Sequence, residues 1–283
     1  MVGITEALSE YKVRVEAWRT EMDRQMRAPG PGGWLAIVGM YPLRLGLNTV
    51  GSTDDCDVLL PAGSAPPRVG TVEFLDKQWV LVVTTDELVT VDQEPVHTSK
   101  LRTYNDVGGM SVVQVRQVSF GIQQWASDPV NIRVWDANSP KRLSFPGRSW
   151  YPIDPKLRVI GQFTPYGSAR ELTVAHTGGQ SQELRNIGVI DFEVRGTRFH
   201  FEACEYVEGD GYIWLLMRDG TTSASTYGAG RFLNTTFADD GSVDLDFNKL
   251  YHPPCAFCDF TTCPMPPSGN VIPFPIEAGE RFP

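Results

Sequence analysis

The segment 187-IGVIDFEVRGTRFHFEACEY-206 decides the fold of the second half of this chain. Apolar and polar residues alternate on both sides of Arg195-Gly196, a pattern typical of two antiparallel strands joined by a two-residue turn. Counting outward from the turn gives three cross-strand pairs on one face: Glu193 with Arg198, Asp191 with His200, and Val189 with Glu202. Ile190, Phe192, Phe199 and Phe201 share the other face. We therefore expect a sheet with one face in a hydrophobic core and one charged face.

The residues after this hairpin continue the same domain. Two further strands are predicted, at Tyr212–Met217 and Val243–Phe247, and a proline-rich tail with little regular structure follows them. Before the hairpin, turn signals are dense over residues 136–157, which indicates a linker. We assign residues 158–283 to a C-terminal antiparallel β domain that the proline-rich tail closes as a strap.

The first half of the chain has a different rhythm. Between Trp34 and Trp135, short runs rich in valine, leucine and tryptophan alternate with turn signals, which predicts a β-sandwich over residues 31–135. Ahead of it, residues 5–27 place apolar side chains three and four positions apart: Leu8, Tyr11, Val15, Trp18 and Met22. This spacing predicts one amphipathic helix within residues 1–30, with its apolar stripe packed on the body of the protein.

Composition excludes several classes of protein. The 283 residues are 41% hydrophobic and 21% charged, close to the globular average, and leave room for two domains. Because 34 acidic residues outweigh 25 basic ones, we expect neither nucleic acid nor an anionic membrane as a partner. The longest apolar run, Trp34–Leu43, is far shorter than the roughly 20 residues that span a bilayer.

The N-terminus and the cysteines bear on the compartment. The first residues lack the pattern of a secretory signal, and the five cysteines form an odd set unlike a secreted disulfide framework. We therefore expect a cytoplasmic protein. Its expected partner is a small-molecule ligand, and a homodimer is possible.

Family resemblance rests mainly on the last 70 residues or so. The distinctive strings are Thr226-Tyr-Gly-Ala-Gly-Arg-Phe232, Leu245-Asp-Phe-Asn248, Tyr251-His-Pro-Pro-Cys255, Cys263-Pro-Met-Pro-Pro267 and Gly279-Glu280. They resemble the bacterial family known as domain of unknown function 1684, and weaker matches extend to Gly33-Trp-Leu35 and Trp150-Tyr-Pro152. The resemblance implies a β-rich, two-part protein without an agreed activity. His252 and Cys258 depart from the family pattern, so a role for either need not be family-wide.

A second resemblance concerns the sandwich. Gly46-Leu-Asn-Thr-Val-Gly-Ser52, Asp57-Val-Leu-Leu-Pro61 and Arg68-Val-Gly70 are similar to the opening of forkhead-associated (FHA) domains, which read phosphothreonine through loops after those strands. The Ser-Arg-x-x-His element of that family is missing here. We therefore expect an FHA-like sandwich that does not read phosphopeptides.

One candidate centre is a compact group of metal-ligand types. His252, Cys255, Cys258 and Cys263 supply four donors within twelve residues, the number and type that tetrahedral zinc prefers. The same residues allow a disulfide of Cys255 with Cys258 or Cys263, or buried free thiols. No organic-cofactor motif is present, so we expect no cofactor, with zinc as the open alternative.

The favoured candidate is a site for a small anionic molecule in the C-terminal domain. Arg231, Arg218 and Asn248 are the predicted substrate-binding residues, because guanidinium groups bind carboxylates and phosphates in a bidentate manner. Tyr227, His252 and Asp246 are the predicted catalytic residues, with Tyr227 or His252 moving the proton and Asp246 orienting its partner. The alternative is that Arg231 pairs with Asp219 or Asp246 and holds the tail.

These residues favour hydrolase or cofactor-free lyase or isomerase chemistry. Two alternatives stay open: a non-catalytic interaction protein that uses the sandwich, and a zinc protein that uses the Cys/His loop. On the hairpin, Asp191, His200 and Glu202 form a further candidate for general base catalysis, for which a solvated charged face is the alternative.

Overall fold

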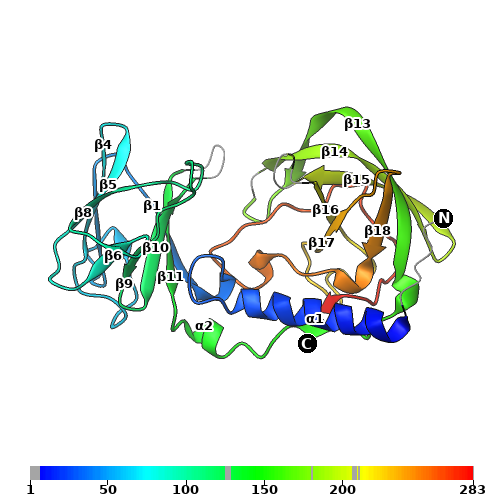
Figure 1. The fold of residues 1–283 in the computed structure, drawn as a ribbon, viewed down its shortest axis with the longest axis horizontal. Helices are drawn as coiled ribbons and strands as arrows, with labels where there is room; N and C mark the ends of the chain where they lie inside the picture. The colour runs from blue at the N-terminus through cyan, green and yellow to red at the C-terminus, as the bar shows by residue number, and fades with distance from the viewer. Residues whose placement is uncertain (1–6, 125–128, 180, 206–208, 210, 283) are drawn as a thin grey trace. The chain divides into compact units, whose positions relative to one another are not determined.

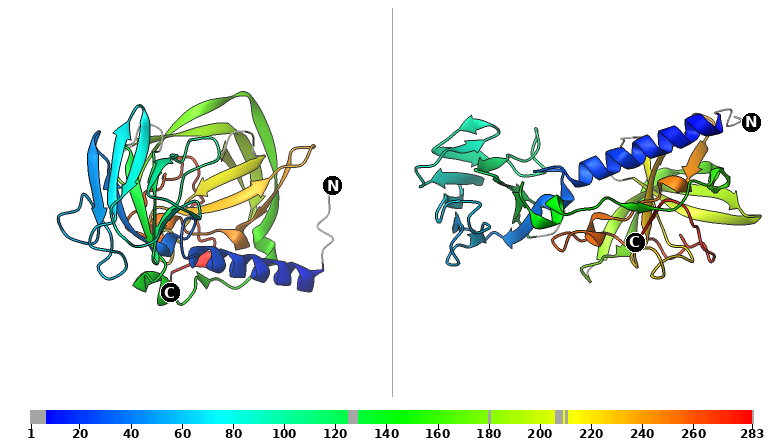
Figure 2. Two further views of the ribbon diagram at one scale, coloured as in Figure 1. Left: turned by 60° about the vertical axis from the view of Figure 1, so that its left-hand side comes forward. Right: turned by 90° about the horizontal axis from the view of Figure 1, so that it is seen from below.

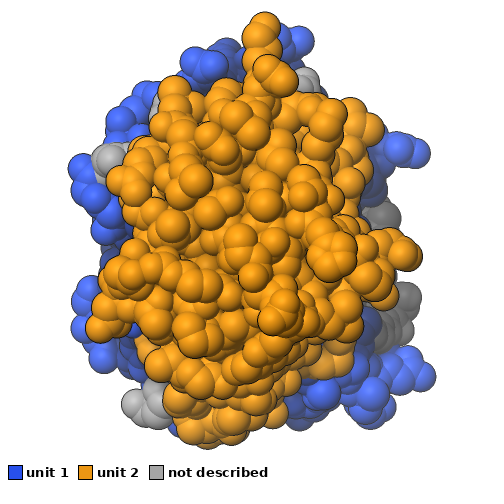
Figure 3. All heavy atoms as spheres, turned by 90° about the vertical axis from the view of Figure 1, so that its left-hand side faces the viewer, with its two compact units in different colours: residues 1–23, 147–283 blue, residues 24–146 orange. Residues whose placement is uncertain are grey.

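The computed structural model describes residues 7–124, 129–179, 181–205, 209 and 211–282 (Figure 1). The chain forms two compact units, unit 1 with residues 1–23 and 147–283, and unit 2 with residues 24–146 (Figure 3). Strands dominate both units, which confirms the mainly β fold class (Figures 1 and 2). Residues 5 and 6 of the predicted helix and Tyr206 at the end of the predicted hairpin lie outside the described residues.

Unit 2 is a sandwich of two sheets. One sheet has the order β1-β11-β10-β9-β6-β7, and the other has the order β3-β2-β4-β5-β8. The strands are β1 (Ile37–Pro42), β2 (Leu47–Gly51), β3 (Val58–Leu59), β4 (Gly70–Leu75), β5 (Gln78–Val83), β6 (Val89–Val91), β7 (Glu94–Pro95), β8 (Thr98–Leu101), β9 (Val113–Val115), β10 (Val118–Gln123) and β11 (Asn131–Asp136). The unit also holds two short helices, η1 (Trp34–Ala36) and α2 (Pro140–Leu143).

The valine and leucine runs of the sequence form the core of this sandwich. Alternate residues of β5, such as Trp79 and Leu81, are buried between the sheets, as a period of two requires. The central strand β10 is buried along its whole length, because both of its edges are paired and both of its faces are covered. The predicted sandwich is therefore present.

Unit 1 is built on one six-stranded antiparallel sheet with the order β17-β16-β15-β14-β13-β18. Its strands are β13 (Arg158–Ala175), β14 (Ser181–Val194), β15 (Thr197–Glu205), β16 (Tyr212–Met217), β17 (Arg231–Thr236) and β18 (Ser242–Asp246). The two edge strands, β17 and β18, are joined by a tight turn in which Phe237 bridges to Val243. The sheet therefore curls into a nearly closed barrel (Figure 1).

The hairpin predicted from the sequence joins β14 to β15 with the expected register. Asp191 pairs with His200, and Phe192 pairs with Phe199. Arg195 and Gly196 have φ angles of 52° and 76°, so both turn residues are in the left-handed region that the tightest hairpin turns require. Turn chemistry and hydrophobic alternation thus agree, and this agreement made the register predictable.

The helix α1 (Leu8–Met26) packs on unit 1 with its apolar face, as predicted. Trp18 meets Trp150 edge to face at 5.5 Å between ring centroids, and the hydroxyl of Tyr11 donates to Asp246 Oδ1 at 2.7 Å. Burial and this hydrogen bond raise the pKa of Tyr11, so the phenol stays protonated and donates.

The Tyr11 hydrogen bond gives a first prediction. Tyr11→Phe is expected to lower the free energy of unfolding by about 1–2 kcal/mol, since it removes a buried donor from a carboxylate. Urea-induced unfolding followed by circular dichroism measures the loss. Val13→Ala on the exposed face of the same helix is the control and should leave the midpoint unchanged. A wild-type midpoint for Tyr11→Phe would show that the helix is held by packing alone.

The C-terminal residues form the predicted strap with little regular structure. Its regular elements are η3 (Phe247–Lys249), η4 (Pro254–Ala256) and β19 (Glu280–Arg281). Strand β19 pairs with β12 (Ser149–Trp150), which lies just before η2 (Pro155–Leu157) and β13. Ile272, Ile276 and Ala278 are fully buried in the barrel core, so the strap completes that core.

Candidate functional site

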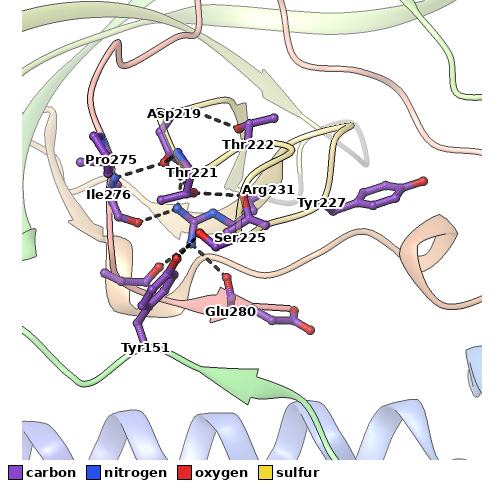
Figure 4. A network of polar contacts seen from close by, with 12 residues as sticks. Tyr151, Asp219, Thr221, Thr222, Ser225, Tyr227, Arg231, Pro275, Ile276 and Glu280 are labelled. Atoms are coloured by element: carbon purple, nitrogen blue, oxygen red, sulfur yellow. Dashed lines mark hydrogen bonds and ion pairs between the residues drawn. The ribbon is translucent and has the colours of Figure 1, made fainter. Parts of the chain in front are cut away.

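Arg231 lies at the start of β17 and is 1% exposed. Its Nη2 donates to Asp219 Oδ2 at 2.7 Å and to the carbonyl of Ile276 at 2.8 Å. Its Nη1 donates to the carbonyls of Ala278 and, at 3.1 Å, Glu280 (Figure 4). The guanidinium therefore binds the strap to β17, and the structure shows the alternative in which Arg231 pairs with Asp219 and holds the tail.

The carboxylate of Asp219 accepts further hydrogen bonds besides the one from Arg231. Oδ1 of Asp219 accepts from the backbone N–H and the hydroxyl of Thr221, at 2.8 and 2.7 Å, and from the N–H of Ile276 at 3.1 Å. A buried ion pair with this many additional hydrogen bonds offsets its own desolvation. Both members are thus engaged within the protein.

His252 belongs to a second buried group beside the strap. Its Nε2 accepts from the N–H of Tyr227 at 3.2 Å, and its own N–H donates to Glu280 Oε2 at 2.7 Å. Its Nδ1 lies 3.5 Å from Glu280 Oε1 without forming a hydrogen bond. Glu280 also forms an ion pair with Arg148. His252 therefore holds the Tyr227 backbone in place.

Asp246 and Asn248 belong to a different network, near the N-terminal end of α1. Asn248 Nδ2 donates to the Tyr11 hydroxyl at 2.8 Å and to the Asp154 carbonyl at 2.9 Å. Its Oδ1 accepts from the Asp154 N–H at 2.9 Å, while Asp246 Oδ1 accepts from Tyr11. The predicted substrate-binding and catalytic residues described so far are thus divided among three groups.

Burial limits what these residues can bind. The exposed fractions are 3% for Asp246, 0% for Asn248, 1% for His252 and 1% for Arg231. Arg218 is half-buried and directs Nη2 toward the sulfur of Met265 at 3.7 Å. A dissolved ligand therefore does not reach the four buried side chains in this conformation.

The hairpin candidate is partly assembled on the exposed face of the sheet. His200 Nδ1 lies 2.8 Å from Asp191 Oδ1, and both side chains are more than half exposed. Glu202 instead interacts with Asn186 and accepts from the Tyr166 hydroxyl at 3.1 Å. The structure brings together two of the three residues.

The Cys/His loop places its four donors in different surroundings. None of the cysteines within the described residues forms a disulfide; Cys258 and Cys263 are buried, whereas Cys255 is partly exposed. Across residues 7–124, 129–179, 181–205, 209 and 211–282, no three or more His, Cys, Asp or Glu side chains are grouped so as to hold a metal ion. His252 itself contacts Tyr227 and Glu280.

Two of these cysteines meet each other and two hydroxyl groups. Cys255 packs against a buried cluster that includes Cys263, and its thiol interacts electrostatically with Cys263, Tyr227 and Thr177. The Tyr227 hydroxyl also lies 3.3 Å from the Cys255 carbonyl oxygen. In Figure 4 the Tyr227 side chain points away from Arg231. We call Cys255, Cys263, Tyr227 and Thr177 the thiol cluster.

Hydrogen bonding makes the two thiols unequal. The bond from Cys263, followed by those from Tyr227 and Thr177, lowers the pKa of Cys255 to about 7 against the opposing effect of burial. Burial and the same contacts raise the pKa of Tyr227, so its hydroxyl keeps its proton. The arrangement can therefore present Cys255 as a thiolate at neutral pH.

Sequence reasoning missed Thr177, which positions the second thiol. Its Oγ1 accepts from the N–H of Cys263 at 2.9 Å, and its N–H donates to the Cys263 carbonyl at 3.0 Å. Thr177 follows the end of β13, far from the cysteines in sequence, and only the neighbouring Gly178-Gly179 marks the turn. No spacing rule links the two segments.

The comparisons with known proteins find a family model that matches the C-terminal part of the chain. Residues 143–281 match the family model described as "Protein of unknown function (DUF1684)". The match includes Trp150-Tyr-Pro152 and confirms the resemblance carried by the C-terminal strings. No curated protein matches the chain.

Several solved structures resemble parts of the chain. An uncharacterized protein of Haloarcula marismortui, solved by NMR, is 27% identical and covers 50% of this chain and 78% of its own, with a TM-score of 0.42. The FhaA FHA domain, solved in complex with the intracellular domain of Rv3910, is 20% identical and covers 33% of this chain and 85% of its own, with a TM-score of 0.24. A further FHA domain, from a study of phosphothreonine-dependent interactions, is 20% identical and covers 34% of this chain and 81% of its own, with a TM-score of 0.24.

The sequence contains no apolar run long enough to span a bilayer. Among the residues that the structure describes, no helix combines the length and the hydropathy needed to cross a bilayer.

Proposed function

We propose that the C-terminal unit acts on a small electrophilic molecule through the thiol of Cys255. The observation that carries the proposal is the partly exposed Cys255, which packs against the buried cluster that contains Cys263 and has the Tyr227 hydroxyl 3.3 Å from its carbonyl oxygen; these neighbours and Thr177 lower the pKa of its thiol. Donors aimed at a sulfur stabilise its thiolate, which is the nucleophilic form of cysteine. The site therefore differs from the predicted anion site, although Tyr227 belongs to both.

Each neighbour has a role in this scheme. Cys255 attacks the electrophilic atom, and the hydroxyls of Tyr227 and Thr177 stabilise its negative charge before the attack. His252 touches neither sulfur nor substrate; it positions Tyr227 by accepting a hydrogen bond from its backbone N–H. Arg231 and Asp219 hold the strap that carries the cluster. A covalent thioester or thioether intermediate is compatible with hydrolase, lyase or binding activity.

Thiol reactivity provides the test. Cys255 of the native protein is expected to be alkylated by iodoacetamide with a midpoint near pH 7. In Tyr227→Phe the midpoint should rise by about one pH unit, since a hydrogen bond to a charged group contributes about 1.5–3 kcal/mol. Peptide mapping after timed quenching gives the rate for each cysteine, and a parallel sample with chelator shows whether a metal masks the thiols.

Cys56 is the matched control, because it is also partly exposed but lies in unit 2. Its alkylation rate should not respond to Tyr227→Phe. If Cys255 reacts as slowly as the buried Cys204, with and without chelator, the proposal is wrong. The interaction protein that uses the sandwich would then be the better hypothesis.

A further inference from the structure

The thiol cluster contains a second sulfur that nucleophilic attack on a carbon electrophile does not use. Cys255 packs against the buried cluster that contains Cys263, although seven residues separate them in the sequence. Cys263 is 5% exposed, whereas Cys255 is partly exposed. A dissolved reagent therefore reaches the sulfur of Cys255 more readily than the sulfur of Cys263.

Cys263 is also held in place more firmly than a surface thiol would be. Both of its backbone groups are bonded to Thr177, and the next residue, Pro264, bridges to His176. Cys255, in contrast, lies in the short helix η4 after Pro253-Pro254. The backbone of Cys263 is thus held by the turn that follows β13, whereas Cys255 lies on a separate segment.

We infer that Cys255 and Cys263 form a disulfide in a two-step reduction of a hydroperoxide. The inference rests on the proposed function, since Cys255 is again the nucleophile. It adds the class of substrate and a role for Cys263. The product is an alcohol, or water when the substrate is hydrogen peroxide.

The two thiols supply the two electrons that reduce the peroxide. The Cys255 thiolate attacks the distal oxygen of the hydroperoxide, the O–O bond breaks, and the alkoxide leaves and takes up a proton. Cys255 is then a sulfenic acid. The sulfur of Cys263 attacks the sulfenic sulfur, the S–S bond forms, the S–O bond breaks, and hydroxide leaves with the Cys263 proton as water. Two thiols are oxidised, and one peroxide is reduced to an alcohol and water.

The third cysteine of the loop, Cys258, is an alternative disulfide partner for Cys255. Cys258 is closer to Cys255 in the sequence, yet Cys263 and not Cys258 belongs to the buried cluster against which Cys255 packs. Proximity in the chain and proximity in the fold thus predict different disulfides. The pair that forms first distinguishes between them.

The experiment treats the reduced, full-length protein with one equivalent of hydrogen peroxide, blocks the remaining thiols, and maps the peptides without reduction. Cleavage after Phe257 and after Phe260 places the three loop cysteines on separate fragments. A fragment pair that links Cys255 to Cys263 is the expected result. A link to Cys258, a stable sulfenic acid in the wild type, or no oxidation would overturn the inference.

Three variants complete the design. Cys258→Ser is the matched control and should form the Cys255–Cys263 link as the wild type does. Cys263→Ser should abolish the link and leave a Cys255 sulfenic acid that reacts with dimedone, whereas Cys255→Ser should abolish both. If Cys255 alkylates at neutral pH but peroxide forms no link, the inference fails while the proposed function stands. If Cys255 is unreactive toward both reagents, both fail, and mapping of the wild type decides this even if a variant does not fold.

Discussion

Arg231→Ala is expected to destabilise the protein by about 3–5 kcal/mol, because it leaves Asp219 as a buried charge without its partner. The same substitution removes the donors that three strap carbonyls share. Urea-induced unfolding measures the loss. A soluble variant with this loss of stability would show that Arg231 anchors the strap.

The control uses an arginine whose carboxylate partner is exposed. Arg198 lies 3.6 Å from Glu193, with the two side chains 90% and 56% exposed, and Arg198→Ala should leave the unfolding midpoint unchanged. A wild-type midpoint for Arg231→Ala would contradict the anchoring role and return Arg231 to consideration as a ligand-binding residue.

A double-mutant cycle with Asp219 separates pairing from packing. Arg231→Met combined with Asp219→Leu should lose less stability than the two single losses added together, because neither charge then remains unpaired. Additive losses would mean that the two residues act independently, which their 2.7 Å contact argues against.

The predictable part of the fold is the part with periodic signals. The register of the β14–β15 hairpin is confirmed for all three predicted charged-face pairs, because the turn at Arg195-Gly196 and the alternation of Phe199 and Phe201 with polar residues impose the same register. Helix α1 was equally visible, because its apolar spacing is regular over several turns.

The site was less predictable, because it depends on the strap. The C-terminal strings cluster tyrosine, arginine, aspartate and asparagine in glycine-bearing segments, a pattern that fits a ligand site and an anchoring network equally well. Burial distinguishes the two, and burial comes from Ile276 and its neighbours, which have no helical or strand period. Sequence spacing also could not choose between Cys258 and Cys263 as the neighbour of Cys255, since the deciding contacts come from Thr177 on a distant segment.

Asn270 shows how an aperiodic residue can replace part of a sheet. Strands β15 and β16 share one residue pair, Cys204 with Trp214, and continuing that register would place Glu202 opposite Leu216. The Asn270 side chain takes up that position. Its Oδ1 accepts from the Glu202 N–H at 2.8 Å, and its Nδ2 donates to the carbonyls of Glu202 and Leu216 at 2.9 Å each.

Asn270→Ala is therefore expected to lower the free energy of unfolding by about 3 kcal/mol or more, since three strand groups lose their partner at about 1–3 kcal/mol each when buried. Asn270→Asp is isosteric but turns two donors toward carbonyl oxygens into acceptors, so its loss should be at least as large. Asn234→Ala on the exposed side of β17 is the control and should change little.

Hydrogen exchange locates the effect within the sheet. In Asn270→Ala the amide of Glu202 should exchange faster than the amides of the β14–β15 pairs around Phe192, because it has lost its acceptor while those pairs keep theirs. Equal acceleration throughout unit 1 would mean that the variant loosens the whole barrel. Unchanged protection of Glu202 would mean that β15 and β16 close directly on each other, and the bridging role of Asn270 would then be wrong.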